Sequence, residues 1–502
     1  MNRRHIVVIS GGSAANSLVD VFGKVAEDRG CFLSYVIPIS DNGGSSSELI
    51  RVFGGPGIGD VRSRLVRLIP EDPTGANTEK SALKAFFNHR LDSSPQAARH
   101  EWLEIVEGHH SLWNHITSPK RELIRSFLNT INLEIVKRAR PTSVFNFQSA
   151  SVGNLFLTGA RIFTGSFEAA IYLLGSITGV KDNVEVIPAI NSNFSYHISA
   201  GLRDGTVIVG QNNISHPIAP SSIPTEHVSP RTHSRKISFD MLEHDKVEDA
   251  NLPGSLPTLR KQNIDFRKED TEGLSSQIDR IWYINPYGQE IRPSPNSRVV
   301  DALDDASCVI FSIGSLYTSI LPCLILRDVG AAIADPKIRF KILILNGCLD
   351  RETPEYTAKE FISAIVRGCC GNESITEADQ IKEEEWKKYV THVVFLEGPG
   401  TPYVDRVELR RLGIEAVRVY GRRVGSDSPG SLNVAKPESS KVVKSAGDKT
   451  IMSIITEGIN DATKTTVDSS AGMLYDGAGL GRALEAILGV KGDKSRRNTL
   501  IG

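Results

Sequence analysis

Two short apolar runs near the N-terminus, joined by a glycine turn and a helix, restrict the fold of this chain more than any other feature. The β-branched run Ile6–Ile9 leads into a Ser-Gly-Gly-Ser turn, and a helix capped by Asn16 or Ser17 is expected next. The run Leu33–Ile39 then predicts a second buried strand. A strand, a helix and a parallel strand form a right-handed unit, which is how a doubly wound sheet begins.

The same order of strand, polar turn and helix recurs in the second half of the chain. Strands are predicted at Cys308–Phe311, Phe340–Leu345 and His392–Leu396, each followed by a polar turn. Because parallel strands are usually connected by helices, this repetition indicates an α/β fold with a doubly wound, mainly parallel sheet. Ligands of such sheets bind outside the carboxyl ends of the strands, so the polar turns are expected to lie together at that edge.

The composition indicates an ordinary globular chain and excludes several classes of partner. Of the 502 residues, 40% are hydrophobic and 23% are charged, and the formal net charge is −1. This balance gives no basis for nucleic-acid or membrane binding, and no apolar run approaches the roughly 18 residues of a membrane span. Six cysteines without paired spacing indicate buried thiols in a reducing compartment. We therefore expect a cytoplasmic protein, with a homodimer as an open alternative for its oligomeric state.

Changes in composition divide the chain into one main domain and segments of different character. We expect an α/β domain over residues 1–420, with a mostly helical insertion at about 74–140 and a charged, proline-containing, disordered insertion at about 219–276. Residues 421–455 predict a second flexible insertion, after which residues 456–502 complete the domain. The helical insertion carries His109, His110 and His115. Exposed or packing roles are favoured for them over metal binding, because no carboxylate accompanies them at ligand spacing.

The stretch from Asp41 to Leu68 concentrates residues that suit phosphate binding. An Asp-Asn-Gly-Gly-Ser turn begins at Asp41, and a second glycine turn precedes Asp60 and Arg62. Glycines let backbone amides approach a ligand closely, and a helix start supplies donors to an anion. Asp41 and Asp60 are candidates to hold a divalent cation, and Arg62 or Arg64 to contact a phosphate. Two surface turns with solvated charges are the alternative.

Other turns after predicted strands offer further polar groups to the same edge. Tyr317 can stack on a base or sugar while neighbouring hydroxyls meet phosphate oxygens, or it can pack across the start of its helix. Asn154 can bind a base, a sugar or a neighbouring loop. The candidates for contact with a nucleotide outside the 41–68 stretch are Gly11, Gly12, Ser13, Asn154, Ser315, Tyr317, Thr318 and Asn346.

Several blocks of the sequence, taken in order, resemble the CofD/YvcK-like family, which includes 2-phospho-L-lactate transferases and gluconeogenesis factors. The run GSLYTSILP from Gly314 is the most specific of them. The blocks span about residues 6 to 400 and are Gly11-Gly12-Ser13, Asp41 to Ser46, Pro56 to Leu65, Ser151 to Leu155, Asp204-Gly205, Gly314 to Ser319, and Asn346 with Glu352-Thr353.

This resemblance implies a Rossmann-like α/β/α sandwich that binds a nucleotide or a nucleotide-diphosphate-linked molecule. For a magnesium-dependent transferase of the 2-phospho-L-lactate type, Asp41 would hold Mg²⁺ and act in catalysis with Asp60 and Arg62. The resemblance also places Asn42, Gly43, Gly44 and Ser45 at the nucleotide.

The alternative that the resemblance implies is a regulator of carbon metabolism that binds a UDP-sugar without catalysis. Family members commonly have a second aspartate where Asn42 stands, and many have a histidine where Ala150 stands. Both departures weaken the prediction of magnesium-dependent transfer more than that of nucleotide binding.

Overall fold

The computed structural model describes residues 5–12, 14–40, 43–70, 78–140, 144–216, 273–371, 383–424 and 472–489, together with residues 256 and 259. Ser13, Asp41 and Asn42 lie outside these ranges, so the roles predicted for them remain predictions. The same holds for nearly all of the insertion expected at 219–276 and for residues 425–455.

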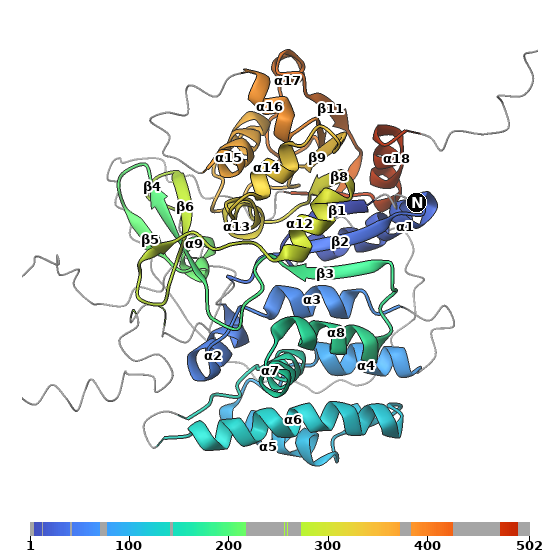
Figure 1. Cartoon of the computed structure of the whole chain (residues 1–502), viewed down its shortest axis with the longest axis vertical. Helices are drawn as coiled ribbons and strands as arrows, with labels where there is room; N and C mark the ends of the chain where they lie inside the picture. Colours follow the sequence, from blue (N-terminus) through green and yellow to red (C-terminus); the bar gives the residue numbers. More distant parts are fainter. Residues whose placement is uncertain are drawn as a thin grey trace, which may run out of the picture.

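A seven-stranded sheet forms the centre of the fold, in the order β11-β10-β9-β8-β1-β2-β3 (Figure 1). Each neighbouring pair is parallel, which confirms the predicted Rossmann-like α/β fold. Apart from the edge strand β11, most residues of these strands are buried, as expected when helices cover both faces of a parallel sheet. Their bounds are β1 His5–Ile9, β2 Phe32–Ile37, β3 Val184–Pro188, β8 Ala306–Phe311, β9 Phe340–Ile344, β10 His392–Phe395 and β11 Glu415–Arg418.

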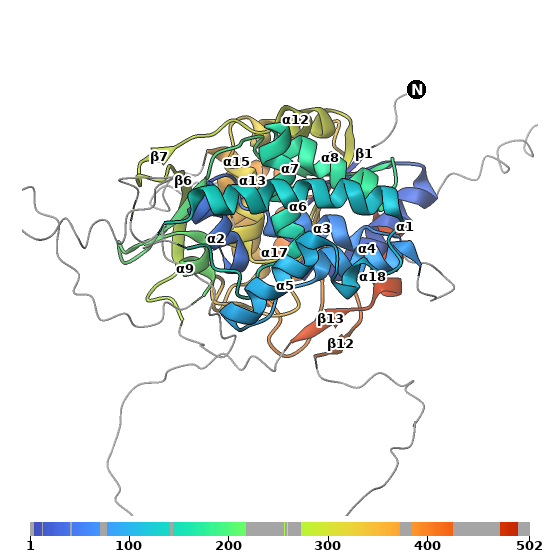
Figure 2. The ribbon, with the colours of Figure 1, turned by 90° about the horizontal axis from the view of Figure 1, so that it is seen from below.

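Helices cover the two faces of this sheet. The helices α1 (Val19–Arg29) and α18 (Gly477–Ile487) lie on one face, and α12 (Ser297–Asp304) and α15 (Ala358–Cys370) lie on the other (Figures 1 and 2). Local signals set their ends: α1 stops at Gly30, which has a left-handed φ of 62°, and a capping box begins α15. Other helices of the second half are α14 (Val329–Ala334), α16 (Glu383–Tyr389) and α17 (Arg406–Arg411).

A stack of helices continues the fold beyond β3, the last strand of the sheet. The helices α3 (Gly59–Arg67) and α8 (Phe167–Thr178) pack against β3, and α6 (Ser118–Arg138), together with α5 (Pro95–Glu107), lies at the far end of the stack (Figure 1). Residues 78–140, the described part of the insertion predicted at about 74–140, are mainly helical. The other helices of the stack are α2 (Gly44–Phe53), α4 (Glu79–Asn88) and α7 (Val152–Thr164).

Of the three histidines at residues 109–115, His109 and His115 are exposed, whereas His110 is half-buried and lies beside a carboxylate. His110 Nε2 lies 3.6 Å from Glu101 Oε1, and His89 Nε2 lies 2.6 Å from the same oxygen. A carboxylate therefore does accompany His110, although the sequence spacing does not show it. Within the described ranges, however, no group of three or more His, Cys, Asp or Glu side chains could hold a metal ion.

A second, antiparallel sheet in the order β5-β4-β6-β7 stands at the carboxyl-end side of the main sheet (Figure 1). Its strands are β4 His197–Leu202, β5 Val207–Val209, β6 Ile278–Ile284 and β7 Glu290–Ile291. From the sequence, the run Thr206–Val209 predicts a strand, which corresponds to β5, whereas β4, β6 and β7 are not predicted. β4 pairs with β6 across a long insertion, and this pairing has no local signal.

The six cysteines, all within the described ranges, form no disulfide. Cys31, Cys308 and Cys323 are buried as predicted, but Cys348 and Cys370 are exposed, contrary to the prediction. No helix of the described residues is long and apolar enough to cross a bilayer.

The C-terminal segment of the described chain runs across the ends of β9 and β10. There β13 (Met473–Tyr475) pairs with β12 (Gly421–Arg423), and Met473 N donates to Gly347 O at 2.8 Å. Tyr475 Oη donates toward two strand-end carbonyls, Leu345 O at 2.8 Å and Val394 O at 3.1 Å. This hydroxyl holds the segment against the sheet.

We expect Tyr475→Phe to lower the free energy of unfolding by about 1 kcal/mol, because it removes a buried donor and keeps the ring. Tyr420→Phe is the matched control, since Tyr420 is 79% exposed and should change stability by less than about 0.5 kcal/mol. Urea unfolding of both variants measures the difference. Equal stabilities would show that the hydroxyl does not hold the segment.

Candidate functional site

The order of the strands reverses between β1 and β8. From β1 the chain adds β2 and β3 on one side, and it later adds β8, β9, β10 and β11 on the other side. Ligands of open α/β sheets bind at such a switch point, outside the carboxyl ends of the strands. The turns after Ile9 and after Phe311, which are register partners, therefore form the candidate site.

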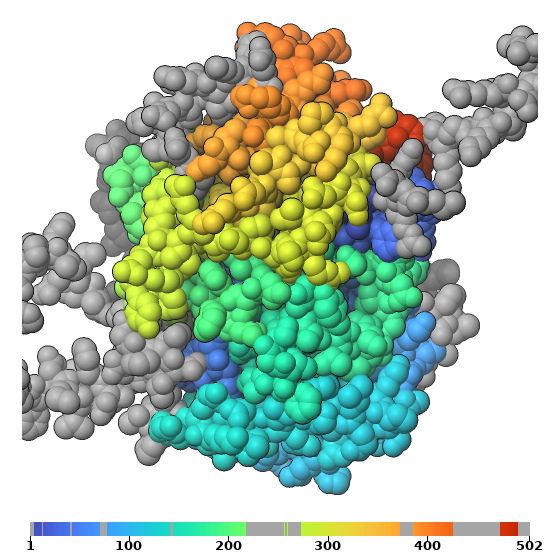
Figure 3. Space-filling view, in the orientation of Figure 1, coloured from blue at the N-terminus to red at the C-terminus, as the bar shows by residue number. Residues whose placement is uncertain are grey.

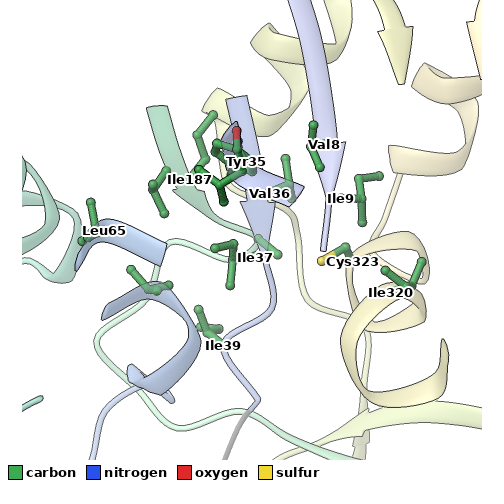
Figure 4. Close-up of a cluster of buried hydrophobic side chains, with 14 of the residues drawn as sticks. Val8, Ile9, Tyr35, Val36, Ile37, Ile39, Leu65, Ile187, Ile320 and Cys323 are labelled. Atoms are coloured by element: carbon green, nitrogen blue, oxygen red, sulfur yellow. The ribbon is translucent and has the colours of Figure 1, made fainter. Parts of the chain in front are cut away.

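The apolar core reaches up to this switch point. Ile9, the last residue of β1, lies beside Cys323 and Ile320. Ile37 and Ile39 lie nearer to Leu65, a residue of α3 (Figure 4). All of these side chains are at most 3% exposed. The turns thus rest on a fully packed base.

Gly11 and Gly12 bring Asp60 and Ser319 to the first turn. A Cβ atom at Gly12 would lie 2.4 Å from Asp60 Oδ1 and 2.7 Å from Asp60 Cα. A Cβ atom at Gly11 would lie 2.5 Å from Ser319 Oγ. Both glycines are therefore required for close packing. The structure brings together Gly11, Gly12 and the half-buried Asp60, which the sequence assigns to one site.

Asn346 fixes the second turn, at Gly314. Its Nδ2 donates to Gly314 O at 2.9 Å, and Gly314 N donates to Asn346 Oδ1 at 2.9 Å. Both ends of the carboxamide are thus used by the backbone of the turn. Asn346, predicted to contact a nucleotide, positions the turn, and the half-buried Ser315 stays at the edge beside it.

Glu352, in the loop between β9 and α15, organises the start of the next helix, η3 (Leu316–Ile320). Its buried carboxylate accepts from Tyr317 N at 2.9 Å, Thr318 N at 3.2 Å and Thr318 Oγ1 at 2.6 Å. It also accepts from Ser215 Oγ at 2.8 Å, at the end of α9 (Gln211–Ser215). Burial, followed by the nearby Asp350 carboxylate, raises the pKa of Glu352 to about 7. The sequence places Glu352 in a family block but gives it no role.

The structure corrects the roles predicted for Tyr317 and Thr318. The Tyr317 ring is 1% exposed, and its hydroxyl lies 2.9 Å from Tyr356 Oη and 3.3 Å from Ile278 O. Thr318 donates its hydroxyl to Glu352. Both side chains face the core because the first turn of η3 is anchored to Glu352, so Tyr317 has no ring face available for stacking.

Arg62, Asn154 and Ser45 form a buried polar network. Arg62 Nε donates to Asn154 Oδ1 at 3.2 Å, and Asn154 Nδ2 donates to Ser45 Oγ at 3.1 Å. Arg62 also donates to Asn88 Oδ1 at 3.2 Å. These contacts link α2, α3, α4 and α7, and the half-buried Gly43 and Gly44 lie at the start of α2, just before Ser45. Three residues predicted for the site thus meet, and each has a partner within the protein.

Arg64 supports the first glycine turn from inside. Its Nη2 donates to Ser10 Oγ at 3.1 Å and to Gly11 O at 3.0 Å, and its guanidinium lies 4.5 Å from the centre of the Tyr35 ring. The side chain is fully buried, and this burial lowers the pKa of Arg64 to about 10. Arg64 is therefore a positioning residue and does not reach the surface where a phosphate would lie.

Comparison with known proteins shows which family this chain belongs to. The family described as 2-phospho-L-lactate transferase CofD matches residues 6–420. The chain belongs to the CofD family. An uncharacterized protein of Saccharomyces cerevisiae, YNL011C, is 38% identical over 410 residues, covering 78% of this chain and 90% of that protein.

More distant similarity extends to bacterial proteins and to a solved structure. The gluconeogenesis factor of Bacillus subtilis is 21% identical over 417 residues, covering 82% of this chain and 89% of that protein. The crystal structure of protein BH3568 from Bacillus halodurans has a TM-score of 0.51 at 19% identity and covers 84% of this chain and 93% of that one. This structure supports the fold alone.

We expect Gly12→Ala to lower the free energy of unfolding by about 1–3 kcal/mol, because the added methyl group would push against the Asp60 backbone. Gly23→Ala is the matched control. Gly23 lies inside α1 with no atom within 4 Å of an added Cβ, so this change should stabilise the protein by about 0.5–1 kcal/mol. Chemical denaturation measures both, and a Gly12→Ala protein as stable as the wild type would contradict the close approach of Asp60.

We expect Glu352→Gln to destabilise the protein by about 1–3 kcal/mol, because an amide group would then face backbone and hydroxyl donors. The loss should depend on pH. The pKa of Glu352 is raised from 4.5 to about 7, so the folded state binds more protons than the unfolded state in this window. The contribution of Glu352 to the free energy of unfolding of the wild type therefore falls as the pH rises from about 4.5 to 7. The difference in free energy of unfolding between the wild type and Glu352→Gln becomes smaller over the same range. Urea unfolding at pH 5 and pH 7.5 measures this difference, and Glu107→Gln, which changes an exposed carboxylate, is the control. The same difference at both pH values would refute the expected titration of Glu352.

Proposed function

We propose that this chain binds a nucleotide-diphosphate-linked small molecule at the β1–β8 switch point. The observation that carries the proposal is the convergence of two glycine turns with Asp60, Ser315 and Ser319 where the strand order reverses. Backbone amides and hydroxyls at strand ends suit phosphate oxygens, and the half-buried Asp60 adds a carboxylate. Asp41 to Gly44 would extend the same edge along the start of α2.

Magnesium fits this arrangement only if the protein and the phosphate oxygens of the bound ligand coordinate it together. Mg²⁺ in nucleotide sites is commonly held by one or two carboxylates plus phosphate oxygens. Asp60 can supply one carboxylate, and Asp41 would supply the second. Bound in this way, the ion would neutralise the diphosphate.

Two observations favour binding without turnover, as in a regulator of carbon metabolism. Transfer of a nucleotide-linked group calls for cations that stabilise the charge developing on the diphosphate. The guanidinium groups of Arg62 and Arg64, the two candidates from the sequence, both bind groups within the protein. In addition, relatives that match most of this chain are called gluconeogenesis factors.

A transferase of the 2-phospho-L-lactate type is the second candidate. The description of the matching family favours it, and so does the position of Asp60 against the first glycine turn. In this function Asp60 and Asp41 would hold Mg²⁺ at the diphosphate, and Arg62 would act only after leaving its contacts with Asn88 and Asn154.

Calorimetric titration of the full chain with GDP, GTP and UDP-N-acetylglucosamine, each with and without Mg²⁺, tests the proposal. We expect one ligand class to bind. Metal-independent binding of the UDP-sugar alone supports the regulator, whereas guanine-nucleotide binding that tightens with Mg²⁺ supports the transferase. If none of the three binds at millimolar concentration, the proposed ligand class is wrong.

We expect Asp60→Asn to weaken any Mg²⁺-dependent binding at least tenfold and to leave metal-independent binding nearly unchanged, because it removes charge and keeps shape. Glu107→Gln, which removes an exposed carboxylate from α5, is the control. Unchanged Mg²⁺-dependent affinity in Asp60→Asn would remove Asp60 from the site.

A further inference from the structure

A cleft of about 300 Å³ lies apart from the switch point, between the β6–β7 hairpin, the segment that follows α13 (Leu321–Leu324) and the end of α15. In the space-filling view, the yellow-green residues of the hairpin region lie beside the yellow residues around α13 and α14 (Figure 3). Gly11, Gly12, Asp60 and Ser319 are not among the residues that line it. The cleft is therefore a separate feature of the surface.

The base of the cleft is tightly built. Tyr283 Oη donates to Pro322 O at 2.8 Å, which ties β6 to α13. A Cβ atom at Gly330 would lie 2.0 Å from Cys369 O, so α14 and the end of α15 are in close contact. Because backbone and buried side chains form this base, the cleft has a defined shape before any ligand arrives.

Three arginines line the cleft, and among the residues that the structure describes only one of them has a charged partner. Arg280 forms two hydrogen bonds to Glu290, at 3.2 and 3.0 Å, and its guanidinium lies 4.4 Å from the centre of the Trp282 ring. Arg292 and Arg327 are exposed, and their guanidinium groups make no hydrogen bond or ion pair with any residue that the structure describes. Arg327 N donates to Pro293 O at 3.4 Å, which joins the two walls that carry these arginines.

We propose that this cleft is a second anion site, which takes a small molecule bearing a phosphate or diphosphate group. Guanidinium groups match phosphate oxygens by paired hydrogen bonds, and two arginines carried by adjacent segments of the cleft can share one such group. The volume is at the lower end of the range for small-molecule sites and suits a compact ligand.

Asp328 sets a limit on this site and provides a sharp test of it. It is exposed and lines the cleft, so its negative charge would repel a bound anion. Its backbone has a φ of 64°, which lies in the left-handed region. Asparagine tolerates this backbone conformation as well as aspartate does. Asp328→Asn therefore removes the charge and preserves the backbone.

Calorimetric titration of the full chain with inorganic pyrophosphate tests the proposal. We expect the double variant Arg292→Gln/Arg327→Gln to lose at least tenfold in affinity for this site, and Asp328→Asn to gain severalfold. Arg339→Gln is the matched control, because it removes an exposed arginine that does not line the cleft. Urea unfolding of each variant verifies that the fold is kept.

Pyrophosphate could also enter the switch point, so Gly12→Ala is titrated in parallel. Binding that survives Gly12→Ala and weakens in the double arginine variant supports the second site. Binding that Gly12→Ala abolishes and the double arginine variant leaves unchanged places the anion at the switch point and overturns the proposal. Absence of any pyrophosphate binding by the wild type at millimolar concentration overturns it as well. The proposed function is tested separately, by the titrations with GDP, GTP and UDP-N-acetylglucosamine.

Discussion

The parallel pairing of β1 with β8 is the constraint on which the rest of this structure depends. It joins strands from the two halves of the chain at the centre of the sheet, with Ile9 opposite Phe311. Ser312 N donates to Ile9 O at 3.0 Å and extends the ladder by one residue, so the turns after both strands begin at the same level. Because the chain leaves β1 in one direction and returns on its other side, these two turns meet at the reversal point.

Buried charges hold the two turns in place. Arg64 lies under the first turn, and Glu352 lies at the start of η3, just after the second. Taking a charge out of water is costly unless hydrogen bonds replace the lost hydration. Glu352 receives four such bonds from η3 and α9, and Arg64 donates to the turn and lies over Tyr35. These residues support the site without facing its ligand, which explains why residue type alone assigned Arg64 to the wrong position.

Much of the fold follows from local patterns in the sequence. The runs at residues 6–9, 308–311 and 340–345 are short, apolar and followed by polar turns, and each forms a strand of the main sheet at nearly the predicted place. The strands β4 and β6 have no comparable local pattern, and their pairing spans the long insertion. A pairing of that kind is set by burial of β4 against α9 and of β6 against α13, which sequence periodicity does not report.

The sequence by itself determined the parallel α/β fold, the glycine turns at the strand ends and the family, because strand periodicity, turn chemistry and ordered blocks are local properties. Only the tertiary structure decided which polar residues face the edge and which face the core. Tyr317 and Asp60 look equally suited to a ligand in the sequence. Yet Glu352 draws the start of η3 inward and buries Tyr317, while the missing side chains of Gly11 and Gly12 let Asp60 approach the turn. The direction in which a side chain points depends on partners far away in the chain, and those partners are fixed only when the strands have paired.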